Sequence, residues 1–143
     1  MNEETKRKWL KTFLRVYGVL TFFIFGSLSV GFLIQIPLMK YPDGPLNWLI
    51  WDDVTGHVGP MLFVIYLVWG AFFFLAANNP LKYRSFLDFT LWANLAHGVL
   101  MVPMALMEGF YSSKFLTDIP FILILAIGLA FLRPSSVEVP RVA

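Results

Sequence analysis

The chain has 143 residues, of which 58% are hydrophobic and 14% are charged, with a formal net charge of +2. Soluble domains are roughly 45–50% apolar, so this composition excludes an ordinary soluble domain and predicts a membrane protein. Its basic residues lie beside apolar stretches instead of forming one patch, so we expect the lipid bilayer as a partner and no nucleic acid. Cysteine is absent, which excludes disulfide bonds, thiolate metal sites and a cysteine nucleophile.

Four stretches contain no Asp, Glu, Lys or Arg, and they cover residues 16–39, 54–81, 89–107 and 119–132. Backbone groups in hydrocarbon must be hydrogen-bonded within their own segment or in a closed barrel, and continuous apolar runs without alternation favour helices. The sequence therefore predicts an all-α integral membrane protein, a four-helix up-down-up-down bundle that forms one transmembrane domain over residues 1–143. The predicted helices cover residues 17–38, 57–77, 86–107 and 116–132.

The first predicted helix follows a basic segment, residues 6–15, which resembles the start of a secretory signal. Its apolar run of about 24 residues is longer than the roughly 7–15 of a signal peptide, and no small-x-small cleavage motif follows it. We therefore expect this segment to remain as the first membrane span.

The connections between the predicted helices are short, which favours antiparallel neighbours. The longest one, residues 40–53, begins with a Pro- and Gly-rich turn and contains Trp48 and Trp51, which indicates a segment along the membrane interface. The fourth apolar run has only 14 residues, about 21 Å of helix, and reaches spanning length only with residues 115–118. A short, tilted or re-entrant fourth helix stays open.

The distribution of basic residues predicts an orientation. With both termini in the cytoplasm of a bacterium and the four spans in its inner membrane, nine of the eleven basic residues lie inside. These nine are Lys6, Arg7, Lys8, Lys11, Arg15, Lys82, Arg84, Arg133 and Arg141.

The third predicted helix carries an organised polar pattern. Six residues recur at steps of four and three, which predicts one stripe that faces the bundle interior: Thr90, Asn94, His97, Met101, Met104 and Glu108. Together with polar residues of neighbouring segments, namely Gln35, Asp52, Asp53 and His57, the stripe forms a candidate site for a ligand or for proton transfer. The alternative is that these groups only hydrogen-bond neighbouring helices.

The two histidines do not predict a haem site. His57 lies at the mouth of the second predicted helix and His97 about ten residues inside the third, so their depths differ by about 12–15 Å. Axial ligands must approach one iron at similar depth, so this separation argues against haem. Asp52 and Asp53 precede a helix, where negative charge suits the helix dipole. We identify no catalytic constellation, no metal site and no specific cofactor.

Several segments carry a resemblance. They read WDDVTGH at residues 51–57, ANNPL at 77–81, RSFLDFT at 84–90 and WANLAHG at 92–98. Over residues 57–107 this order resembles the BphX-like small bacterial membrane proteins, near the wider DoxX-like group. The resemblance implies a four-helix fold without an established activity, with Asp88, Thr90 and His97 at its matching polar positions.

The sequence favours an accessory or binding subunit over a self-contained enzyme, because no catalytic motif accompanies the spans. One alternative is a redox or proton-linked subunit that binds a quinone or another lipophilic ligand near His97. Another is a minimal transporter that assembles as an oligomer. Each of these functions implies a second copy of the chain or another membrane protein as partner.

Overall fold

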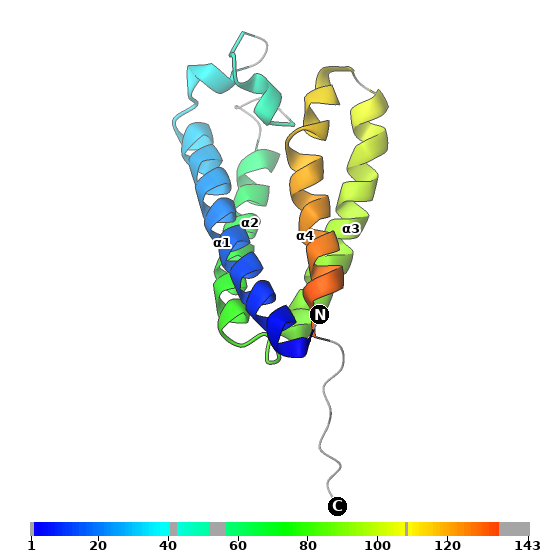
Figure 1. Cartoon of the computed structure of the whole chain (residues 1–143). Coiled ribbons are helices and arrows are strands. Elements are labelled where there is room, and N and C mark those ends of the chain that lie inside the picture. Colours follow the sequence, from blue (N-terminus) through cyan, green and yellow to red (C-terminus); the bar gives the residue numbers. More distant parts are fainter. Residues whose placement is uncertain (1, 41–42, 52–56, 108, 135–143) are drawn as a thin grey trace, which may run out of the picture.

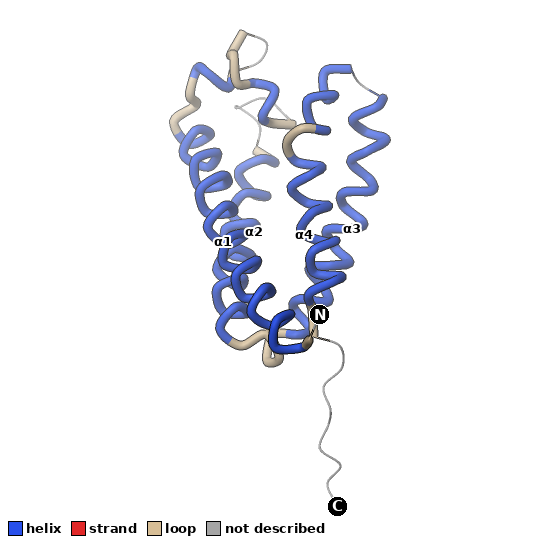
Figure 2. The backbone as a smooth tube through the Cα atoms, viewed as in Figure 1, coloured by secondary structure: helices blue, strands red, loops and turns tan. Residues whose placement is uncertain are grey.

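The computed structural model describes residues 2–40, 43–51, 57–107 and 109–134 (Figures 1 and 2). Within these residues the chain contains helices and no strand. The α-helices are α1 (Glu3–Leu33), α2 (Val58–Asn78), α3 (Arg84–Met107) and α4 (Asp118–Leu132), and the short 3₁₀ helices are η1 (Pro37–Met39), η2 (Asn47–Leu49) and η3 (Gly109–Phe115). Four segments are long and apolar enough to cross a membrane, which confirms the predicted all-α four-helix membrane fold.

The four helices are arranged as two hairpins. Helix α1 lies along α2, and α3 lies along α4, whereas the backbones of α2 and α3 approach each other at few points. Figure 1 shows the two pairs diverging away from the end where the chain passes from α2 to α3. The expectation that all consecutive helices are close neighbours is therefore wrong for most of the length of α2 and α3.

Side-chain size explains this difference. Inside the hairpins glycines permit close approach: Gly70 of α2 faces Thr21 of α1, and Gly98 of α3 faces Leu123 of α4. A Cβ atom on Gly98 would lie 2.5 Å from Leu123 Cδ2, so a larger residue at this position would force the Leu123 side chain to move. Between α2 and α3 the contacts come from large rings, which hold the two backbones apart.

Helix α1 begins at Glu3, so the predicted start at residue 17 is wrong. The Asn2 side chain caps the helix by accepting a hydrogen bond from the Thr5 backbone at 2.8 Å, and Glu3 and Glu4 in the first turn suit the helix dipole. The basic segment that precedes the first apolar run is therefore the first part of the same helix.

Burial of two leucines holds this first part of α1 in place. Leu10 and Leu14 are fully buried in a core cluster to which all four helices contribute. Its buried members are Leu10, Leu14, Tyr17, Phe73, Ala76, Ala77, Leu87, Leu91, Leu125 and Leu129. Between these two leucines, Phe13 packs against Gly128 of α4. The start of α1 therefore joins the two hairpins at this end of the bundle.

The first helix ends at Leu33 instead of residue 38, and the turn that follows has a Schellman geometry. The Ile36 N–H donates to the Gly31 carbonyl at 2.9 Å, and the Gln35 N–H donates to the Phe32 carbonyl at 3.2 Å. Gln35 has a φ of +46°, a left-handed conformation that favours glycine.

The other predicted helices differ from the observed ones by only a few residues. The fourth span is composite, because η3 precedes α4 and the apolar segment Tyr111–Leu132 has 22 residues in total. That length is sufficient to cross a bilayer, although α4 itself has 15 residues.

We expect the substitution Gln35→Gly to stabilise the protein by up to about 1 kcal/mol, because glycine adopts the left-handed conformation without a Cβ penalty. The gain should appear as a higher midpoint of thermal unfolding in detergent. The control Gln35→Ala keeps a Cβ atom and should give no gain. An equal rise for both variants would contradict the assignment of strain to this turn.

Candidate functional site

At the end of the bundle formed by η1, η2 and η3, which we call the loop end, the two hairpins are tied together by a tryptophan. Trp51 donates from Nε1 to the Asp118 carboxylate at 2.6 Å, and its carbonyl accepts a hydrogen bond from Tyr111 Oη at 2.8 Å. Ser113 Oγ donates to the Trp48 carbonyl at 3.2 Å. The connection after α1 therefore docks onto the segment that begins the fourth span.

The loop end also contains a completely buried lysine. The Lys114 side chain has no exposed surface, its Nζ atom lies 3.4 Å from Asp118 Oδ2, and it lies 5.4 Å from the centre of the Trp51 ring. An ammonium without water needs compensating charge, which this carboxylate and the face of the indole provide. Asp118 thus accepts from Trp51 and balances Lys114 at the same time.

The middle of the bundle contains a series of stacked aromatic rings, which we call the aromatic series: Phe25, Tyr66, Trp69 and Phe89. The Phe25 and Tyr66 rings are nearly parallel with centres 4.3 Å apart, and the following centres are 6.0 Å and 5.6 Å apart. Trp69 Nε1 donates to Thr90 Oγ1 at 2.8 Å. The series runs from α1 through α2 to α3, and its last pair, Trp69 and Phe89, connects the two hairpins.

His97 lies beside the aromatic series. Its Nδ1 atom is 3.1 Å from Tyr66 Oη, and this is its only hydrogen-bond partner within the described part of the chain. The ring is 13 residues from the start of α3 and 10 from its end, so it lies about 15 Å or more from either end of the helix.

The predicted polar stripe of the third helix is divided in the structure. Thr90, Asn94 and Met101 are buried, and the Asn94 side chain donates to the Thr90 carbonyl at 2.7 Å. His97 and Met104 are exposed, so the expectation that the whole stripe faces the interior is wrong for these two residues. The packed face of α3 passes through Gly98, where α4 approaches closely, and this contact leaves His97 at the edge of that face.

The remaining candidate residues do not gather around His97. His57 is exposed and immediately precedes α2, nine residues before Tyr66 and therefore about 13 Å away along the helix. Gln35 is exposed in the turn after α1. The other three candidates, Asp52, Asp53 and Glu108, lie outside the described residues. The described residues also contain no group of three side chains suited to holding a metal ion.

Some residues at this site were not predicted from the sequence. Tyr66 lies in an apolar run with many other aromatic residues, and nothing in the sequence distinguishes it from them. Lys114 and Asp118 carried a signal, because their spacing of four residues places them on one face of a helical turn near an apolar span.

Comparison with known proteins gives a family without an assigned activity. Residues 8–141 match a family described as a family of unknown function, DUF6632. The chain belongs to this family. No curated protein and no solved structure matches the chain. The resemblance of this DUF6632 protein to BphX-like proteins stays a prediction.

We expect Lys114→Met to destabilise the protein by about 2 kcal/mol, because it leaves the Asp118 carboxylate without its cation. The figure is below that of a fully buried pair because the Asp118 side chain is 30% exposed. Asp118→Asn should also destabilise, and the double variant should cost less than the sum of the two single variants in denaturant unfolding. Lys40→Met, at an exposed lysine, is the control, and strict additivity would contradict the coupling.

Proposed function

We propose that this protein is a membrane-embedded binding subunit that holds a flat, lipophilic ligand with a hydrogen-bonding head group, such as a quinone. The ligand binds against His97 and Tyr66, at the point where α2 and α3 diverge. The exposed position of the His97 ring in the middle of a membrane span carries this proposal.

The cost of exposing a histidine to hydrocarbon supports a ligand at this position. Polar and ionisable side chains within membrane spans are rare and normally face a partner, a cavity or another helix. Tyr66 satisfies one ring nitrogen of His97, which leaves Nε2 without a partner in the described part of the chain. A head group that bonds to Nε2 removes this cost.

The aromatic series supports a flat ligand. Phe89 is 63% exposed, and it lies eight residues before His97 with the half-buried Ala93 midway, so the three residues share one face of α3. A conjugated ring placed along this face contacts the exposed side of Phe89 and approaches His97 with its edge. Stacked aromatic pairs contribute about 0.5–1.5 kcal/mol beyond their burial.

The hydrogen-bond arrangement selects the head group. When Tyr66 Oη donates to His97 Nδ1, the ring proton of the neutral histidine is on Nε2, which then donates to an acceptor such as a quinone carbonyl. The protein binds and orients the ligand, and a partner protein in the same membrane supplies the reaction. This division of roles follows from the absence of a recognisable catalytic motif in the sequence.

We expect His97→Leu to weaken binding of decylubiquinone by at least tenfold, because the substitution removes the donor and keeps the apolar volume. Binding is measured by quenching of tryptophan fluorescence in detergent, since Trp69 belongs to the aromatic series next to the ligand. Mass spectrometry of a lipid extract from the gently purified protein identifies the ligand that copurifies.

The matched control is His57→Leu, which removes the other histidine and should bind decylubiquinone like the wild type. Tyr66→Phe should give an intermediate loss, because it releases His97 without removing it. The proposal is contradicted if wild type and His97→Leu bind decylubiquinone equally. It is also contradicted if the wild type binds none and no ligand is found in its lipid extract. Association of the wild type into dimers that His97→Leu disrupts would instead assign His97 to an interface between copies.

We further propose that both termini lie in the cytoplasm and that the membrane is a bacterial inner membrane, on the strength of the basic residues beside the spans. The chain has no cysteine, so single cysteines report topology cleanly. In intact cells a membrane-impermeant maleimide should label Asn47→Cys, whereas Ser85→Cys should be labelled only after permeabilisation. The reverse pattern would invert the orientation.

A further inference from the structure

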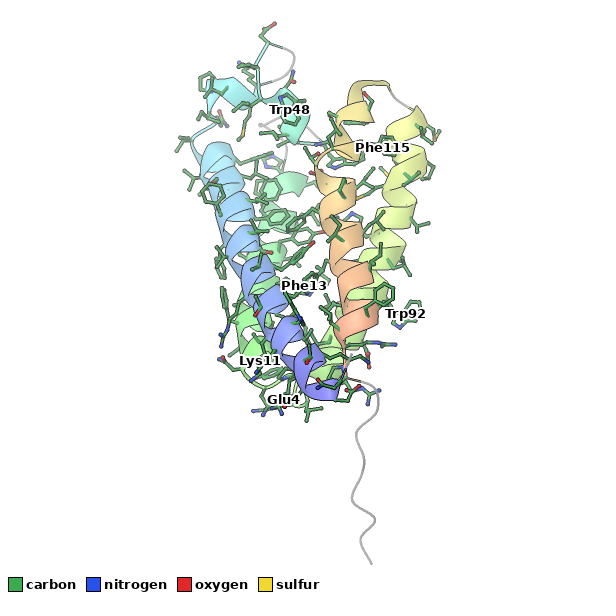
Figure 3. All side chains as sticks on the ribbon, in the orientation of Figure 1. Glu4, Lys11, Phe13, Trp48, Trp92 and Phe115 are labelled. Carbon is green, nitrogen blue, oxygen red and sulfur yellow. The ribbon has the colours of Figure 1, made fainter. Side chains whose placement is uncertain are left out.

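The end of the bundle opposite the loop end concentrates positive charge. The first turns of α1, the turn between α2 and α3, and the end of α4 lie together there, and we call this region the basic end (Figure 1). Figure 3 shows Glu4 and Lys11 toward this end and Trp48 and Phe115 toward the other. Its described charged residues are eight basic ones, Lys6, Arg7, Lys8, Lys11, Arg15, Lys82, Arg84 and Arg133, and three acidic ones, Glu3, Glu4 and Asp88.

All three carboxylates already form ion pairs with basic residues of the same end. Glu3 lies 3.2 Å from Lys6 Nζ, and Glu4 lies 3.8 Å from Lys8 Nζ. Asp88 forms ion pairs with two arginines, one from α3 and one after α4. The acidic side chains of the basic end therefore cannot balance its other cations.

Three of the remaining cations form a stripe on α1. Arg7, Lys11 and Arg15 follow each other at steps of four, so they share one helical face, and none has an ion pair within the described residues. Like charges at this spacing repel each other on a helix. An anion bound beside the stripe would relieve this repulsion.

A cavity of about 290 Å³ lies at the start of this stripe. Arg7 lines it together with three residues that already form ion pairs, Glu3, Glu4 and Lys6. The apolar part of the lining is Leu10 of α1, Pro80 and Leu81 of the α2–α3 turn, Leu132 of α4, and Pro134. Leu81 is 48% exposed and Leu132 is the last residue of the fourth span, so the apolar part of the lining is at the membrane boundary.

We propose that this cavity binds the head group of an anionic phospholipid. Arg7 contacts the phosphate from within the cavity, and Lys11, the next residue of the stripe, adds positive potential from outside the lining. Leu81 and Leu132 contact the glycerol and the first methylenes of the acyl chains. The occupant combines a negative charge with an apolar body, and the cavity combines the unpaired Arg7 and the adjoining cationic stripe with leucine and proline. The site is separate from His97 and does not depend on the proposed ligand there.

The test is native mass spectrometry of the full-length, delipidated protein titrated with phosphatidylglycerol or phosphatidylcholine. We expect the wild type to bind its first phosphatidylglycerol at least tenfold more tightly than phosphatidylcholine. The double variant Arg7→Gln/Lys11→Gln should reduce this preference to twofold or less. The single variant Arg7→Gln changes an exposed position on a helix and should reduce the preference for phosphatidylglycerol partially. It replaces the double variant in the test if the double variant does not fold.

The matched control is Lys82→Gln/Lys40→Gln, which removes two positive charges from outside both the cavity lining and the stripe and leaves the ion pairs of Glu3 and Glu4 in place. It should keep the wild-type preference. The proposal is overturned if wild type binds both lipids equally, or if the control loses as much preference as the cavity variant, since net charge alone would then explain binding. Displacement of the lipid by millimolar inorganic phosphate would assign the site to free phosphate and also overturn it.

Discussion

Leu10 and Leu14 of α1 are buried against residues of the other three helices, in the cluster that joins the two hairpins at the basic end. Full burial of an aliphatic side chain contributes about 1.5–3 kcal/mol in water-soluble proteins, and here both leucines lie in the part of α1 that precedes its most apolar run. Without this contact the hairpins would be connected mainly by aromatic rings in the middle and by Trp51 at the loop end.

The same arrangement determines what lies at the surface in the middle of the bundle. Small residues bring the helices of each hairpin close together, whereas Trp69 and Phe89 separate α2 from α3. Because α4 packs over Gly98, His97 comes to lie at the edge of the contact face, next to Tyr66. Exposure of this histidine is thus a consequence of how side-chain size spaces the helices.

Charged groups are placed at the two ends of the bundle and serve different purposes. At the loop end a single carboxylate, Asp118, balances the buried Lys114 and holds Trp51, so the charge there is internally compensated. At the basic end Asp88 holds two arginines, but Arg7 and Lys11 keep unpaired charge beside a cavity. The first arrangement stabilises the fold, whereas the second leaves charge available for an external anion.

The sequence by itself determined that the protein is a bundle of four apolar helices, because hydropathy and segment length are local properties that decide whether a segment can cross a membrane. It also drew attention to His97. Only the tertiary structure decided that α1 starts at Glu3, that His97 is exposed beside Tyr66, and that Trp51 bonds with Asp118, 67 residues away. Periodicity in the sequence predicts which residues share a helical face. The volumes of side chains on the other helices decide whether that face is packed against a neighbouring helix or left exposed.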